Sequence, residues 1–169
     1  MLNAMSIPEE SGVVAPTQRA SDVDTVGTLL DLAEWEFLHG LYHSGENASP
    51  KFAIPDLVSA CVSLVFSEPV DAKQIVFEFV RTDFTLRSRA VKPRRCSIDI
   101  WRPQYEVLRS LQVSGDNRYP NPKFDLGDFT TACVALVMGC ADAQAKILDQ
   151  ARKNSVNRAR ESDRPPARA

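Results

Sequence analysis

Two short stretches of the chain alternate between apolar and polar residues. They are TVGTLLDL at residues 25–32 and CSIDIW at residues 96–101. A period of two is typical of a β-strand that buries one of its faces. The pattern therefore predicts two strands. The side chains expected on their inward faces are Val26, Thr28, Leu30, Leu32, Ile98 and Ile100.

Helical periodicity follows each predicted strand. In AEWEFLHGLY (33–42) and PQYEVLRSLQ (103–112), apolar residues recur on one side. Pro103 suits the first turn of a helix. A Ser-Gly-acid-Asn turn follows each segment, and Gly45 and Gly115 are placed to cap the helix ends.

A second and a third helix are expected after each of these turns. The second helices are strongly apolar and begin near Asp56 and Asp128, and each aspartate suits an N-cap. The third helices are expected near residues 70–82 and 142–154.

The elements recur because the sequence itself is repeated. PKFAIPDLVSACVSLV from Pro50 and PKFDLGDFTTACVALV from Pro122 share nine of 16 residues at an offset of 72 positions. Upstream, FLHGLYHSGEN (37–47) matches VLRSLQVSGDN (107–117) at an offset of 70. Two related units fill most of the chain, which indicates a duplication and not a solenoid.

One strand per unit has a physical consequence. A lone buried strand leaves its backbone N–H and C=O groups without partners, which costs free energy. The two units can satisfy these groups by pairing their strands, antiparallel, about a pseudo-twofold axis. The predicted fold class is mainly α with one two-stranded antiparallel ribbon, in a monomer that acts as a pseudo-dimer.

The domain boundaries follow from the repeat and from composition. The two ends of the chain are rich in Pro, Ser, Glu and Arg and poor in apolar residues, which is typical of disorder. The expected organisation is a disordered arm at 1–22, one domain at 23–154 (repeats at about 24–86 and 94–154, basic linker 87–95) and a disordered basic tail at 155–169.

Composition places the chain among soluble globular proteins, with 44% hydrophobic and 25% charged residues among 169. No apolar run is long enough to span a membrane, and the N-terminus does not resemble a secretory signal. The four cysteines form no CxxC pair, and Cys61 and Cys133 fall at matching repeat positions. Free buried thiols in a reducing cytoplasm are the simplest interpretation.

The net charge of −2 argues against a general nucleic-acid binder, but the charge is unevenly distributed. Residues 1–56 hold nine of the 22 acids and two of the 20 bases. Many of the other bases gather in two clusters, which are either anion-binding patches or solvated surface. These are Arg87, Arg89, Lys92, Arg94, Arg95 and Arg102, and then Arg152, Lys153, Arg158, Arg160, Arg164 and Arg168.

The doubled order of strand, helix, turn and helix resembles the single-chain ribbon-helix-helix DNA-binding proteins, such as the accessory virulence-region protein of agrobacterial T-DNA transfer. The resemblance is carried by CSIDIWRPQYEVLRSLQVSGDN (96–117), PKFDLGDFTTACVALVMG (122–139) and their first-copy counterparts, and it covers roughly residues 24–154. It implies a ribbon in the major groove, second-helix N-termini on phosphates, and an accessory role beside a relaxase in plasmid conjugation or T-DNA transfer. The implied partners are double-stranded DNA and a relaxase or a transfer-associated ATPase.

Phosphate contacts are expected where positive charge and hydroxyls flank the second helices and the second strand. A helix N-terminus offers free N–H groups and a partial positive charge to an anion. Lys51 and Lys123 recur at the same place in both copies, shortly before these helices. The expected phosphate contacts are Lys51, Lys123, Arg94, Arg95, Ser59 and Thr131.

The outward face of the ribbon is the expected base-reading surface. It is expected to carry Gly27, Leu29, Asp31, Ser97, Asp99 and Trp101. Aspartate accepts hydrogen bonds from cytosine amino groups but repels phosphates, whereas Leu29 and Trp101 suit thymine methyl groups or a protein surface. The face lacks Arg, Lys, Asn and Gln. DNA binding is therefore expected to rest on the DNA backbone and to weaken with salt.

A metal site and an enzyme are not predicted. His39 and His43 are spaced i, i+4, as metal ligands on one helix face are, but no third ligand is evident. The second copy has Arg109 and Val113 at these positions, so the histidines are interpreted as surface residues. No cofactor motif or supported catalytic set is present.

Two alternatives to the DNA-transfer role remain open. One is a protein-interaction module that keeps the scaffold but has lost its groove-reading side chains. The other is a ribbon-helix-helix transcriptional repressor. The acidic first part of the chain and Trp101 favour the interaction module.

Overall fold

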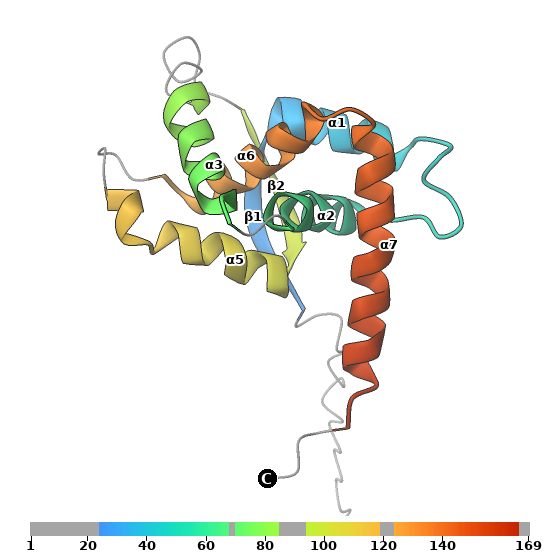
Figure 1. Ribbon diagram of the computed structural model, residues 1–169. Helices are drawn as coiled ribbons and strands as arrows, with labels where there is room; N and C mark the ends of the chain where they lie inside the picture. Colours follow the sequence, from blue (N-terminus) through green and yellow to red (C-terminus); the bar gives the residue numbers. More distant parts are fainter. Residues whose placement is uncertain (1–23, 68–69, 85–93, 119–123, 166–169) are drawn as a thin grey trace, which may run out of the picture.

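The computed structural model describes residues 24–67, 70–84, 94–118 and 124–165 (Figure 1). The chain is mainly helical with one two-stranded antiparallel sheet. In chain order the elements are β1 (Thr25–Asp31), α1 (Leu32–Tyr42), α2 (Ile54–Phe66), α3 (Ala72–Phe79), a π-helical turn (Val80–Phe84), β2 (Arg95–Trp101), α5 (Arg102–Gln112), a 3-10 turn (Gly115–Arg118), α6 (Leu126–Met138) and α7 (Ala143–Ser162).

The two predicted strands pair with each other, antiparallel, as expected. Thr28 lies opposite Ile98, its counterpart in the sequence repeat, so the register is symmetric about this pair. One further hydrogen bond extends the pairing at each end. Leu32 N–H donates to the Arg94 carbonyl at 2.8 Å, and Arg102 N–H donates to the Asp24 carbonyl at 2.6 Å.

The alternation along the strands sets their two faces. Thr28, Leu30, Ile98 and Ile100 are buried, as predicted, and their neighbours Gly27, Leu29, Ser97 and Asp99 are exposed. The prediction fails for the ends of the first strand. Val26 is half-buried, and Leu32 is the first residue of α1.

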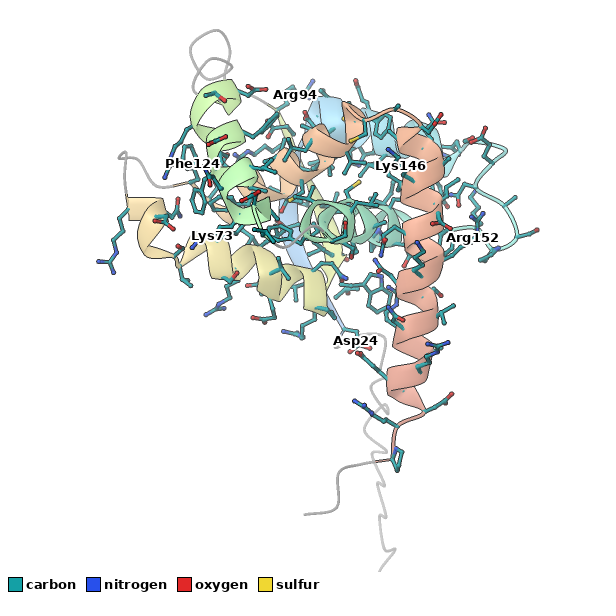
Figure 2. All side chains as sticks on the ribbon, in the orientation of Figure 1. Asp24, Lys73, Arg94, Phe124, Lys146 and Arg152 are labelled. Carbon is teal, nitrogen blue, oxygen red and sulfur yellow. The ribbon has the colours of Figure 1, made fainter. Side chains whose placement is uncertain are left out.

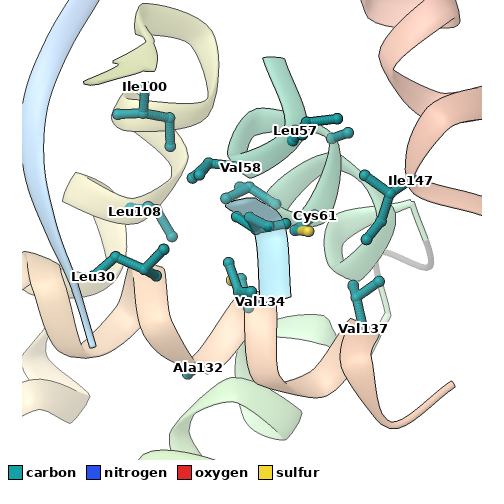
Figure 3. Packing of buried hydrophobic residues seen from close by; sticks show 14 of the residues in the cluster. Leu30, Leu57, Val58, Cys61, Ile100, Leu108, Ala132, Val134, Val137 and Ile147 are labelled. Carbon is teal, nitrogen blue, oxygen red and sulfur yellow. The ribbon is translucent and has the colours of Figure 1, made fainter. Parts of the chain in front are cut away.

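The core lies beneath the ribbon, where α2 and α6 pack against each other and against the strands. Figure 3 shows side chains of both helices in one cluster with Leu30 and Ile100 of the ribbon. Cys61 and Cys133 are free thiols within this core. Burial raises the pKa of Cys61 far above its ordinary value and raises the pKa of Cys133 to about 12, so both thiols stay uncharged.

The N-caps of the second helices lie three residues earlier than predicted. Their N-caps are Ala53 and Asp125, whereas Asp56 and Asp128 occupy the third helical position. From there each carboxylate accepts a hydrogen bond from the N-cap backbone N–H, as in a capping box.

The first helix of each unit ends without a glycine cap, contrary to the prediction for Gly45 and Gly115. The C-caps are His43 and Val113, and no glycine in the described segments has a positive φ. Buried Asn47 and Asn117 explain the difference. Each amide donates to the last carbonyl of its helix and to a second carbonyl beyond the turn, which supplies the partner that a left-handed glycine would otherwise provide.

Helix α7 continues to Ser162, so the predicted disordered tail is wrong for residues 155–162. Figure 1 shows this helix running along one side of the molecule and past the other elements. Besides its buried apolar residues, two polar side chains link it to α2. Asn154 donates to Ser63 Oγ at 3.1 Å, and Arg158 donates to Asp56 Oδ1 at 3.1 Å. The predicted arm at 1–22 and most of the predicted linker lie outside the described residues, and Arg95 of that linker belongs to β2.

Candidate nucleic-acid interface

The outer face of the ribbon forms a shallow hollow. Its centre consists of two cross-strand pairs, Gly27 with Asp99 and Leu29 with Ser97. Leu29 is 40% exposed, which is unusual among the large apolar side chains of the described residues. The hollow has a volume of about 630 Å³ and is lined by Gly27, Thr28, Leu29, Trp35, Ile54, Pro55, Ser97, Ile98 and Asp99. A ligand of this face would meet small, apolar and acidic groups.

The ends of the two strands are tied to the second helices by a matching pair of hydrogen bonds. Asp31 N–H donates to Thr131 Oγ1 at 3.1 Å, and Trp101 N–H donates to Ser59 Oγ at 3.0 Å. Both hydroxyl residues are fully buried. The prediction that Ser59 and Thr131 contact DNA is therefore wrong, because their hydroxyls hold the strands in place.

The N-termini of α2 and α6 carry the protein's own carboxylates. Ala53 N–H donates to Asp56 Oδ2 at 3.0 Å, and Asp125 N–H donates to Asp128 Oδ2 at 2.9 Å. Asp125 completes the second box by accepting from Asp128 N–H at 2.8 Å. These bonds use N–H groups that the sequence assigned to phosphates, so the predicted phosphate contact at the helix N-termini is not available at these donors.

Arg95 sits among three carboxylates at the start of β2. Its Nε donates to Asp31 Oδ1 at 3.2 Å and its Nη1 to Asp125 Oδ2 at 2.8 Å, and its Nη2 pairs with Asp128 Oδ1. The Asp31 side chain is almost completely buried. Arg95 and Asp31 were predicted to face DNA, and this prediction is wrong because both are committed to an internal ion-pair cluster.

The same cluster shifts the ionisation of its two cap-box carboxylates in opposite directions. Burial raises the pKa of Asp128, and the neighbouring Asp125 charge adds to the rise. Burial also acts to raise the pKa of Asp125, but hydrogen bonds from Arg95 and from the Asp128 N–H outweigh it and hold that pKa below its ordinary value.

Trp101 is turned away from the ribbon face that the alternation assigned to it. Its indole Nε1 donates to Asp56 Oδ1 at 2.8 Å, and the Arg158 guanidinium lies 4.0 Å from its ring centroid. The half-buried ring therefore contacts Asp56 of α2 and Arg158 of α7. It does not join Ser97 and Asp99 as a groove-facing side chain.

Six predicted contact residues remain available at the surface. Gly27, Leu29, Ser97 and Asp99 lie on the ribbon face, while Lys51 and Arg94 are exposed beside the elements that flank it. The Lys51 ammonium lies 4.3 Å from the Tyr42 ring centroid, and Figure 2 marks Arg94 just before β2. Lys123 lies outside the described residues.

Four residues of the site were missed by the sequence analysis. Trp35, Ile54 and Pro55 line the hollow, and Asp125 caps α6. The spacing of two acids in DLGD (125–128) is a capping-box signal that sequence alone contains. The other three residues reach the ribbon through tertiary packing, for which the sequence carries no local signal.

The described part of the chain holds neither a cluster of metal ligands nor a candidate membrane span. No three His, Cys, Asp or Glu side chains lie close enough there to hold a metal ion together. Among the same residues, no helix combines the length and the apolar character needed to cross a membrane.

Comparison of the chain with protein-family models, curated proteins and solved structures gives no match.

Proposed function

We propose that this protein binds double-stranded DNA through the exposed face of the β1–β2 ribbon. The observation that carries the proposal is an antiparallel ribbon with a solvent-exposed outer face. Two of the residues on that face, Gly27 and Ser97, are small. The major groove of B-DNA admits a two-stranded ribbon of this kind. The order of strand and helices in each sequence unit supports a ribbon-helix-helix arrangement.

The proposed role is that of a cytoplasmic, non-catalytic accessory protein in conjugative or T-DNA-type transfer. Its support is the resemblance of the sequence to single-chain ribbon-helix-helix proteins. One chain supplies both strands of the ribbon, so a monomer suffices for the proposed contact. A relaxase acting on the same DNA is the proposed protein partner.

The side chains on the ribbon face predict that the two strands contribute differently to base recognition. Leu29 suits a thymine methyl group, whereas Asp99 accepts a hydrogen bond from a cytosine amino group. These residues are counterparts in the sequence repeat, so the two strands favour different bases. Asp99 also repels the phosphates on either side of the groove, which lowers the affinity for every sequence.

The phosphate contacts of the proposed complex come from Lys51 and Arg94. Arg95 and the caps of α2 and α6 are committed within the protein, so Lys51 and Arg94 are the exposed cations left among the described residues of the predicted contact set. Each neutralised phosphate contributes about −0.9 to the slope of log affinity against log salt. Two contacts predict a slope of about −2.

Fluorescence anisotropy with a short labelled duplex tests the proposal. We expect binding at about 50 mM salt that weakens towards about 200 mM. Arg94→Ala and Lys51→Ala should each weaken binding several-fold and make the slope shallower by about 1. Lys73→Ala is the matched control, because Lys73 is an exposed cation on α3 that lines a separate hollow with Asp116. Absence of binding at the lower salt contradicts the proposal.

A protein-docking role is the second candidate, and the lining of the hollow favours it. Leu29, Trp35, Ile54 and Pro55 offer an apolar surface beside the Asp99 carboxylate, which suits a basic, partly apolar protein segment. The two candidates predict opposite effects of Asp99→Lys. Affinity for DNA rises when the negative charge is reversed, whereas affinity for a basic protein segment falls.

A further inference from the structure

Helix α1 carries two imidazoles that face each other across one helical turn. The Nε2 atoms of His39 and His43 are 3.2 Å apart. In the absence of another ligand, this distance allows one ring N–H to donate to the other nitrogen. The same two nitrogens are also the usual metal-binding atoms of histidine.

The distance between the two Nε2 atoms suits the binding of one transition-metal ion by both histidines. Histidine nitrogens bind Zn²⁺ at about 2.0–2.1 Å. Two nitrogens 3.2 Å apart, each at that distance from one ion, subtend an angle of about 100° at it, which is close to the tetrahedral value. The two nitrogens can therefore reach one ion without moving apart, once each ring turns its Nε2 lone pair towards it. Each neutral ring then carries its proton on Nδ1.

Aromatic neighbours restrict both rings. Trp35 stacks on His39 with ring centroids 4.5 Å apart and an interplanar angle of 17°. Tyr42 packs edge to face against His43 at 4.8 Å. A pair of side chains that is already ordered loses less conformational entropy when it binds a ligand.

The arrangement occurs in only one of the two sequence units. Trp35, His39, Tyr42 and His43 correspond to Tyr105, Arg109, Gln112 and Val113 in the second unit. Helix α5 forms with the same length as α1, so the fold of this helix does not need the imidazoles. The first unit therefore carries a chemical feature that packing does not explain.

We propose that His39 and His43 form a binding site for a divalent transition-metal ion of the class that prefers imidazole, namely Cu²⁺, Ni²⁺ or Zn²⁺. The two histidines supply two ligands, and the described residues supply no third from His, Cys, Asp or Glu. Water or an added ligand fills the remaining positions. The site lies on α1, and Trp35 connects it to the ribbon hollow, because this ring stacks on His39 and also lines the hollow.

Calorimetric titration of the full chain with each metal salt tests the site. The titrations use the Cys140→Ser background, because Cys140 is an exposed free thiol and thiolates are competing ligands for these metals. We expect one ion per chain, with Cu²⁺ bound more tightly than Ni²⁺ or Zn²⁺. His39→Gln or His43→Gln should weaken binding at least tenfold, and the double variant should abolish it.

The second unit offers a matched gain-of-site control. Arg109→His with Val113→His places the same i, i+4 pair on α5, and the stoichiometry should rise from one ion to two. Trp35 provides an optical readout, because Cu²⁺ bound beside its stacking partner quenches its fluorescence. Equal metal binding by the wild type and the double-glutamine variant, or no binding by the wild type, overturns the proposal. Circular dichroism of each variant establishes that α1 is intact.

Discussion

The Thr131 hydroxyl accepts a hydrogen bond from the backbone N–H of Asp31, 100 positions earlier in the chain. The equivalent bond joins Trp101 N–H to Ser59 Oγ. Each bond ties the end of one strand to a helix of the other sequence unit, and both hydroxyl residues are fully buried. The interface between the units is therefore fixed by directional contacts as well as by apolar packing.

Removal of either hydroxyl should destabilise the fold. Thr131→Val keeps the shape of the side chain but leaves the buried Asp31 N–H without its acceptor, which costs about 1–3 kcal/mol. Ser59→Ala should have a similar effect on the Trp101 N–H. Urea denaturation followed by circular dichroism measures both changes.

Ser110→Ala is the control for the hydroxyl variants. Ser110 is exposed and donates only to the Val107 carbonyl within its own helix, so its removal should change stability by less than about 0.5 kcal/mol. Thr131→Ser keeps the acceptor and should recover most of the loss. An effect of Thr131→Val no larger than that of Ser110→Ala would show that the cross-unit bond contributes little.

Gly127 should not tolerate a larger residue. A Cβ at this position would lie 3.0 Å from Leu29 Cβ and 3.2 Å from both Arg95 Nη1 and Asp125 Oδ1. Gly127→Ala should therefore shift the ribbon or the ion-pair cluster and cost about 1–3 kcal/mol. Gly40→Ala is the opposite case. No atom lies within 4 Å of the added methyl group, and alanine should stabilise the interior of α1 by about 0.5–1 kcal/mol. Thermal denaturation of both variants checks the difference in sign.

Acid should weaken the contact between Asp125 and Arg95. The folded-state pKa of Asp125 is lowered, so its contribution to stability is complete above the unfolded pKa of about 3.9 and is lost as the pH falls through the folded pKa. Asp125→Asn removes the charge while asparagine still caps the helix. The variant should be less stable than the wild type at neutral pH, and the difference should shrink below about pH 4.

Asp128 acts in the opposite sense, which makes it a useful comparison for the acid experiment. Its pKa is raised in the folded state, so its contribution is largest at low pH and declines as the pH rises through the folded pKa. Urea denaturation at a series of pH values measures how the free energy of unfolding changes with pH, and the two carboxylates contribute to this change with opposite signs. A difference between Asp125→Asn and wild type that does not change with pH would contradict the assignment of the lowered pKa to Asp125.

The Asp99 carboxylate should limit DNA affinity. It lies on the open ribbon face opposite Gly27, where a bound duplex would bring phosphates close to it. Asp99→Asn removes the repulsion and should raise the affinity for duplexes of arbitrary sequence several-fold at low salt, as measured by anisotropy. Asp116→Asn removes an exposed acid that pairs with Lys73 in a separate hollow, and it should leave the affinity unchanged. Equal affinities of Asp99→Asn and wild type would place the duplex elsewhere on the protein.

The two strands and their pairing could be predicted because two sequence signals agreed. The alternation from Thr28 to Leu30 and from Ile98 to Ile100 set the buried face, and the repeated sequence supplied the second strand that the first one needed. Both signals are local or internal to the sequence. The structure confirms the pairing and the inward face at the centre of the ribbon.

The alternation failed at the ribbon ends, where side chains from other elements decide what a residue contacts. Asp31 and Trp101 keep the expected spacing, yet Arg95 draws the first inward and Asp56 binds the indole of the second. Arg95 was predicted as a DNA contact because a positive charge beside a strand suggests one. Its three carboxylate partners come from β1 and α6, and no local pattern brings them together.

The helix ends were mispredicted for a related reason. Glycine after a helix is a common end signal, and the sequence contains it twice, at Gly45 and Gly115. Asn47 and Asn117 supply the hydrogen bonds instead. Their repetition two residues after each glycine was visible in the sequence, but their burial and their bond to the start of the next segment were not.

Because a single polypeptide supplies both strands of the ribbon, its two sides are free to become different. In a homodimer, every substitution appears in both subunits. A side chain that is useful on one side of the ribbon and harmful on the other therefore cannot be restricted to the first. Here the His39–His43 pair and the stack of Trp35 on His39 belong to the first sequence unit, and the second unit has Arg109, Val113 and Tyr105 at these positions. A ribbon built from one chain can therefore carry different functional groups on its two sides, which two identical subunits cannot do.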